Sequence, residues 1–286
     1  MSKPENRIMR QLMIPELLKI LELSLLELLA FVGPVLLLGL LLGSMEKRAN
    51  IYFRKNIGNK ALLLTAWIGV PVHEVGHLLM CWLFRHKVTK VKLLDLKSKD
   101  GTLGYVRHSY NRKSLYQSVG NFFIGIGPIL SANVFLIVSM YLLLPEIFRE
   151  ITGQMLLFSS MTAFGPSGLE YIAGFLLSIV SSLFDLSNAG NISFWIYIFL
   201  AFGVSSHIAL STADLKGAAK GLPALFLLIV LANILAYALD VNTEEALTRT
   251  FLYNMYLLAF TALSVIFSGI NMTAGYFINS YRSLFN

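Results

Sequence analysis

The chain has 286 residues, of which 56% are hydrophobic and only 14% are charged. Soluble globular domains carry about 25% charged residues, so this composition excludes an ordinary soluble domain and indicates a membrane protein. The net charge of +7 is not gathered in a compact basic domain, so we expect lysines and arginines that face anionic lipid and no nucleic-acid partner. Cys81 is the only cysteine, which excludes an intrachain disulfide.

The first apolar stretch, residues 14–44, is unusual because it contains charged side chains. They are Glu16, Lys19, Glu22 and Glu27. Gly33-Pro34 then interrupts the run, so we expect an amphipathic interfacial helix that leads into a short span near 28–44. A cleaved signal peptide is the alternative, but the run is too long and no small-residue cleavage site follows.

Five later segments are long and apolar enough to cross a bilayer, which takes roughly 20 residues. They are residues 61–84, 121–144, 191–213, 222–239 and 250–278. With the N-terminal span they predict an all-α polytopic membrane protein with about six spans. We expect three regions: an N-terminal part with a basic loop at 1–60, a core at 61–221, and C-terminal spans at 222–286.

The segment 61–84 contains the motif His73-Glu74-Val75-Gly76-His77. Helical positions i and i+4 share a face, so His73 and His77 can bind one ion. Zinc takes histidine nitrogens at about 2.0–2.1 Å, and Glu74 is placed to accept a proton from a zinc-bound water. The alternative is three polar side chains that satisfy one another. We favour the metal site, because ionisable residues in membrane spans are usually functional.

Residues 86–109 predict a β-hairpin. Alternating apolar residues from Val88 precede a turn at 98–101, and residues 102–106 can return as a strand. Further on, residues 152–184 contain two short apolar pieces split by Gly165-Pro166-Ser167-Gly168. We expect them to form a re-entrant or interfacial hairpin.

A zinc site of this kind needs a third protein ligand. We expect Asp214 at the C-terminal end of the 191–213 span and prefer it as this ligand. His207, two turns earlier on the same predicted helix, is the alternative. Because His73 and His77 also lie in the C-terminal half of their span, the two spans should run in the same direction. That condition requires an even number of crossings in 152–184.

These motifs resemble the site-2 protease superfamily of intramembrane zinc metalloproteases. HEVGH at 73–77 corresponds to the family's HExxH, and the stretch 206–217 around Asp214 is similar to its second metal-binding motif. The family's Asn and Pro are absent there, with Ser206 or His207 and Ser211 in their places. Gly127-Pro128, followed by Asn133, is similar to the family's G-P-x-x-N element. The resemblance covers about 61–221 and is closest to small members without PDZ or CBS domains.

The resemblance implies a zinc ion held by His73, His77 and Asp214, with Glu74 as the general base. His207, Asn133 and Ser211 are candidates for contacts with the substrate or the oxyanion. The hairpin at 86–109 would offer its edge to a membrane protein or peptide substrate that adds as a strand. We expect a multi-pass protein of the cell membrane, and the distribution of lysine and arginine favours a cytoplasmic hairpin.

Three other classes of protein remain open. The first is a non-catalytic metal-binding membrane protein or pseudoprotease, although Glu74 is intact. The second is a transporter, although the sequence shows no convincing internal repeat. The third is a membrane zinc protease of the CAAX-processing type, in which Glu170 would be the third ligand.

Overall fold

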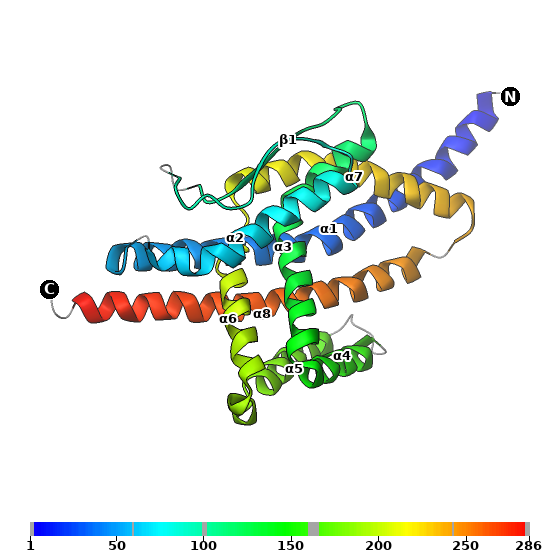
Figure 1. The fold of residues 1–286 in the computed structure, drawn as a ribbon. Coiled ribbons are helices and arrows are strands. Elements are labelled where there is room, and N and C mark those ends of the chain that lie inside the picture. Colours follow the sequence, from blue (N-terminus) through cyan, green and yellow to red (C-terminus); the bar gives the residue numbers. More distant parts are fainter. Residues whose placement is uncertain (1–2, 59, 99–101, 160–165, 242, 284–286) are drawn as a thin grey trace.

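The computed structural model describes residues 3–58, 60–98, 102–159, 166–241 and 243–283 (Figure 1). Within these ranges the chain is mostly helical and has one small sheet. The elements are α1 (Lys3–Asn56), α2 (Lys60–Leu83), β1 (Lys87–Lys92), β2 (Tyr105–Ser109), α3 (Leu115–Leu143), α4 (Pro145–Ser159), α5 (Pro166–Leu183), the 3-10 helix η1 (Leu186–Gly190), α6 (Ile192–Ser205), α7 (Thr212–Ala238) and α8 (Thr243–Ser283).

Five stretches of helix among the described residues are long and apolar enough to cross a membrane. They are 14–56, 115–143, 173–190, 212–238 and 260–283. The described residues therefore form a mostly α-helical protein of membrane type, and the predicted count of about six spans stays a prediction. The predicted span 61–84 folds as α2 but is not one of these five, and it carries the polar residues of the HEVGH motif.

The predicted interruption at Gly33-Pro34 is wrong, because α1 is one continuous helix through this pair and on through most of the predicted basic loop. A proline removes one helical hydrogen bond, but packing on both sides can hold the helix together. Val32, Val35 and Leu42 are buried on either side of Pro34. In Figure 1, α1 and α8 run side by side across α3 and α6.

Helix α3 lies at the centre of the molecule and contacts α2, α6, α7 and α8. Its N-terminal part shares a hydrophobic cluster with α1, α2 and α7, and its C-terminal part shares another with α4, α5, α6 and α8. Figure 1 shows α4 and α5 at the end of α3 that is remote from the hairpin. The bundle therefore separates the hairpin side of the molecule from the α4–α5 side.

The stretch 152–184 does contain two helical pieces, α4 and α5. Two hydrogen bonds join them. Ser178 of α5 donates to Gln154 of α4, and Ser182 of α5 donates to Glu150 of α4 over 2.8 Å. Helix α5 begins at Pro166, so the predicted break lies partly in residues 160–165, outside the described residues.

The predicted hairpin is present as an antiparallel pair of strands. Val91 pairs with Val106 and Lys92 with Tyr105, and a register irregularity lies between Val88 and Lys90. The return strand is 105–109 and not 102–106, and Asp95 N donates to Leu103 O over 2.6 Å in the connection between the strands. Gly104, just before β2, passes directly over α2, because a Cβ there would lie 2.8 Å from Val70 Cγ1.

The predicted span 191–213 is wrong, because the helix ends at Ser205 and a new helix begins at Thr212. Ser211 is the N-cap of α7 and forms a capping box with Asp214. A Ser followed three residues later by an acidic side chain starts a helix, because the two side chains satisfy free backbone N–H groups. Asp214 is thus in the first turn of α7, and His207 lies in a non-helical linker, residues 206–211.

The sequence predicted Asp214 at the end of a span that runs parallel to α2. Asp214 instead lies at the start of α7, so the direction of α6 does not decide whether its carboxylate reaches the histidines. An even number of crossings in 152–184 is therefore no longer required for Asp214 to reach the histidines.

Candidate metal centre

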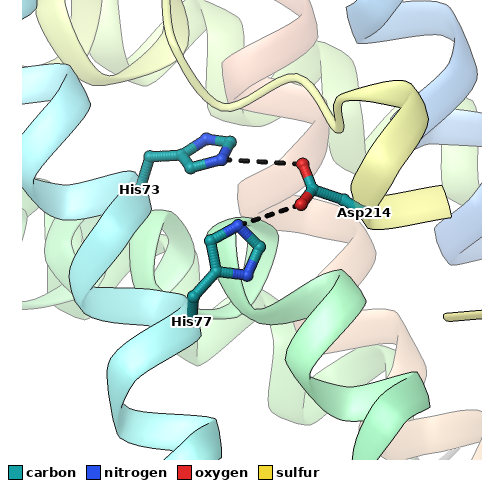
Figure 2. A group of neighbouring side chains, drawn as sticks. All are labelled: His73, His77 and Asp214. Carbon is teal, nitrogen blue, oxygen red and sulfur yellow. Dashed lines mark ion pairs between the residues drawn. The ribbon is translucent and has the colours of Figure 1, made fainter. Parts of the chain in front are cut away.

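Helix α2 places His73 and His77 one turn apart on one face. Their ring centroids are 5.1 Å apart, and the rings meet edge to face. Figure 2 shows both rings directed toward the first turn of α7. The i, i+4 spacing of the motif therefore has the geometric result that the sequence predicted.

A backbone carbonyl orients each imidazole. His73 Nδ1 donates to His207 O over 2.8 Å, and His77 Nδ1 donates to Ile124 O over 2.7 Å. A carbonyl oxygen can only accept, so the hydrogen of each neutral ring is on Nδ1 and the lone pair is on Nε2. Metal-binding histidines are held in this way by a partner behind the ring.

Asp214 faces the two free nitrogens from α7 (Figure 2). Its Oδ1 lies 3.1 Å from His77 Nε2, and its Oδ2 lies 3.8 Å from His73 Nε2. The capping box sets this orientation, because Asp214 Oδ2 also accepts from Ser211 N over 2.7 Å. His73, His77 and Asp214 thus bring three ligand atoms within 4.8 Å of one another, and this group can hold a metal ion.

The spacing of these atoms fits a small tetrahedral ion. Bonds of about 2.0–2.1 Å separate tetrahedral ligands by about 3.3–3.4 Å, and the distances of 3.1 and 3.8 Å lie on either side of that value. Without a metal, a hydrogen bond from His77 Nε2 to Asp214 would require a doubly protonated ring, because Nδ1 already donates to Ile124 O. A metal ion allows the ring to stay neutral.

Glu74 is buried beside this group, and its Oε2 has no hydrogen-bond partner among the described residues. Buried carboxylate oxygens are normally paired, so the free oxygen indicates a position for water or a ligand. The chain at Gly104 passes directly over this side chain. A Cβ there would lie 2.7 Å from Glu74 Cγ and 2.9 Å from its Oε1, so only glycine allows this approach.

A cavity of about 290 Å³ opens in front of His73 and Glu74. Its walls come from α1, α2, the connection between the strands, and the linker. The residues that line it are Glu46, Asn50, Arg54, Val70, His73, Glu74, Leu103, Gly104, His207, Ala209 and Ser211. The cavity gives a small polar molecule or an extended peptide segment a place beside the metal-binding group.

Of the three residues predicted to contact the substrate or the oxyanion, His207 and Ser211 line the cavity and Asn133 does not. The His207 ring is hydrogen-bonded to Thr65 Oγ1 over 2.9 Å, so His207 serves His73 through its carbonyl. Ser211 caps α7. Asn133 instead donates to Thr261 Oγ1 on α8 over 2.8 Å. Glu170 belongs to α5, and its side chain lies outside the described residues.

Gly76 of the HEVGH motif has a packing role, and sequence reasoning missed the contribution of α1. Gly76 packs against α3, because a Cβ at this position would lie 2.3 Å from Gly127 O. Close helix packing therefore explains it. Glu46, Asn50 and Arg54 follow an i, i+4, i+8 pattern that marks one helix face, but nothing in the sequence relates that face to residues 73–77.

Two histidines anchor the base of the hairpin. His86 Nε2 donates to Gln117 O over 2.7 Å, and His86 Nδ1 lies 2.9 Å from His108 Nδ1. Burial, with repulsion from His86 and His77, lowers the pKa of His108 to about 4, and burial also lowers the pKa of His86. Both rings are therefore neutral near pH 7, so one N–H is shared between them and the hairpin is held against α3.

Comparisons of the chain with protein-family models, with curated proteins and with solved structures find no match. The interpretation of the site therefore rests on the residues and distances described above.

Proposed function

We propose that this protein is an intramembrane zinc-dependent endopeptidase that cleaves a membrane-embedded or membrane-proximal substrate. The observation that carries the proposal is the convergence of His73, His77 and Asp214 beside the buried Glu74, at a cavity in an apolar helical bundle. Two histidines and a carboxylate, with a position open to water, are a usual ligand set of catalytic zinc.

The ligand set alone also suits other metals, among them non-haem iron. The motif favours zinc, because a glutamate next to the first histidine is the base in H-E-x-x-H metalloproteases. Zinc would polarise the scissile carbonyl and lower the pKa of bound water to about 7. His73 and His77 would hold it through Nε2, and Asp214 through its carboxylate.

The protein's own residues supply the remaining chemistry. Glu74 takes the proton of the attacking water and passes it to the leaving amine, the two proton transfers that peptide hydrolysis needs. The backbone at Gly104 covers Glu74 and limits its contact with bulk water. His207 O and Ile124 O hold the two imidazoles in the tautomer that leaves Nε2 free.

The hairpin favours the proposal that the substrate is a peptide. Among the described residues, β1 and β2 pair only with each other, so each strand has an open edge. An extended substrate that adds to the sheet recovers its backbone hydrogen bonds. Because the chain at Gly104 leads directly into β2, a substrate strand beside β2 would pass close to Glu74. We further propose that the hairpin is on the cytoplasmic side of the cell membrane.

The test is cleavage of a pool of single-span peptides by the reconstituted protein, compared with a Glu74→Gln variant. We expect Glu74→Gln to retain its metal and to cleave about 100- to 10,000-fold more slowly, the usual contribution of a general base. The control is Glu22→Gln, because Glu22 is exposed on α1. Parent-rate cleavage by Glu74→Gln would contradict the role of Glu74. A metal-binding transporter or pseudoprotease would produce no new peptide ends.

A further inference from the structure

The linker 206–211 between α6 and α7 is held by side chains from three other helices. Ser206 Oγ accepts from Asn271 of α8 over 3.0 Å, and His207 O accepts from His73 of α2 over 2.8 Å. Ala209 N donates to Glu46 Oε2 of α1 over 3.3 Å. Ser206 N and His207 N still donate to carbonyls of α6, over 3.1 and 3.0 Å, and the later Ala209 N donates instead to a side chain of another helix.

This linker determines the orientation of two of the three metal-binding residues. Its carbonyl at His207 orients His73, and its last residue, Ser211, orients Asp214 through the capping box. Ala209 lies midway between these two positions. A shift of the backbone at Ala209 would therefore move His73 and Asp214 relative to each other.

Glu46 is the side chain that holds Ala209. It lines the same cavity as His73 and Glu74, and Asn50, one turn later on α1, lies 3.5 Å from its other oxygen. A carboxylate is costly in a helix apolar enough to span a membrane, and such residues are usually kept for a function. Glu46 does not belong to the metal-binding group, so its function is to be sought in what it contacts.

We propose that Glu46 is a positioning residue for the metal centre. By accepting from Ala209 N, it fixes the linker at the point from which both His73 and Asp214 are oriented. This inference rests on the metal site of the proposed function and not on the peptidase activity. It assigns α1, which provides none of the three metal ligands, a direct role in the geometry of the site.

The test is zinc affinity of the purified full-length protein in detergent, measured by competition with a chromophoric chelator. The absorption spectrum of the cobalt-substituted protein reports the ligand geometry. We expect Glu46→Ala to weaken zinc binding by about 10-fold or more, the effect of losing a group that orients a ligand, and to change the cobalt spectrum. Glu46→Gln keeps an acceptor oxygen, so it should stay within about threefold of the parent.

Two further variants control the experiment. Glu46→Asp keeps the carboxyl group but withdraws the acceptor by one methylene, so it should resemble Glu46→Ala. Glu27 of α1 likewise accepts a hydrogen bond, from Asn233 of α7, but this bond lies away from the linker. Glu27→Ala removes it and should leave zinc affinity unchanged.

Parent-like affinity and spectrum in Glu46→Ala and Glu46→Asp would overturn the inference while leaving the metal site intact. Equal losses in Glu46→Gln and Glu46→Ala, or in Glu27→Ala, would overturn it as well. A parent protein that binds no zinc would instead refute the proposed function. The inference is supported only if Glu46→Ala and Glu46→Asp lose affinity and Glu46→Gln retains it.

Discussion

At the scale of single residues, the candidate site depends on which atom of each side chain is free. The backbone carbonyls of His207 and Ile124 accept hydrogen bonds from Nδ1 of His73 and of His77, respectively. The carboxylate of Asp214 is turned toward both Nε2 atoms while it also caps α7. Each ligand is therefore oriented before a metal arrives, which reduces the entropy lost on binding.

The role of Asp214 as a metal ligand can be separated experimentally from its role in the cap of α7. Asp214→Asn keeps a side-chain oxygen that can accept from Ser211 N, but it loses the negative charge that a metal ligand needs. We expect the helix content to remain and zinc affinity to fall by at least about 100-fold, beyond the range for orienting groups. Circular dichroism and chelator competition measure the two properties.

A second aspartate in a helix cap, Asp185, provides a matched control for Asp214→Asn. Asp185 caps the short helix η1 by accepting from Ser187 N over 2.7 Å, and it is exposed and remote from the metal-binding group. Asp185→Asn should leave zinc affinity unchanged. Parent-like affinity in Asp214→Asn would show that Asp214 is a cap and no ligand.

At the scale of elements, the connection between β1 and β2 covers Glu74. The absence of a side chain at Gly104 brings the chain onto Glu74 and Val70 of α2. His86 and His108 fix the other end of the hairpin to α3 through Gln117. The connection thus places Leu103 and Gly104 in the wall of the cavity.

Gly104→Ala tests this arrangement. The added methyl would lie within 2.9 Å of Glu74 and Val70, so the hairpin or Glu74 must shift. A displacement of about 1 Å near a reacting group can reduce the rate by up to about 100-fold. We therefore expect slower cleavage of the single-span peptides, by about 10- to 100-fold, with zinc affinity unchanged.

The control for this variant is Gly153→Ala on α4, where a Cβ would meet nothing within 4 Å. It should cleave at the parent rate. Cleavage by Gly104→Ala at the parent rate would mean that the hairpin does not determine the position of Glu74.

Elements also show where sequence reasoning succeeded and where it failed. The i, i+4 spacing of the two histidines correctly predicted that they share one face of α2, because helical periodicity depends only on local sequence. The helix restart at Thr212 was readable from Ser211 and Asp214, but the apolar run on both sides was interpreted as one span. The continuity of α1 through Pro34 depends on burial against distant helices, which periodicity does not reveal.

At the scale of the whole molecule, the site is assembled from four segments that are far apart in the chain. Helix α2 brings the histidines and Glu74, α7 brings Asp214, α1 brings Glu46, and the hairpin brings Gly104. Sequence reasoning identified the first two from residue chemistry. It also predicted the hairpin, but it could not identify Glu46 or Gly104 as parts of the site, because their positions follow from packing between segments and not from a motif.

The bundle that holds these segments together uses polar contacts between apolar helices. Asn233 of α7 donates to Ser24 and Glu27 of α1, over 2.9 and 2.7 Å, and Asn56 of α1 donates to Asn279 of α8 over 3.2 Å. Such contacts are typical of helix association in membranes, where apolar surface alone does not distinguish protein from lipid. They join α1 to α7 and to α8 within the bundle.

If bound zinc makes this protein a peptidase, as proposed, removal of the metal should abolish cleavage and its return should restore cleavage. The reconstituted protein is stripped with a chelator, incubated with single-span peptides, and then supplied with zinc, while new peptide ends are detected by mass spectrometry. We predict no new ends without metal and their appearance once about one zinc ion per chain is bound, the stoichiometry of a single site. New ends that form at the same rate without metal, or none with zinc bound, would contradict the claim.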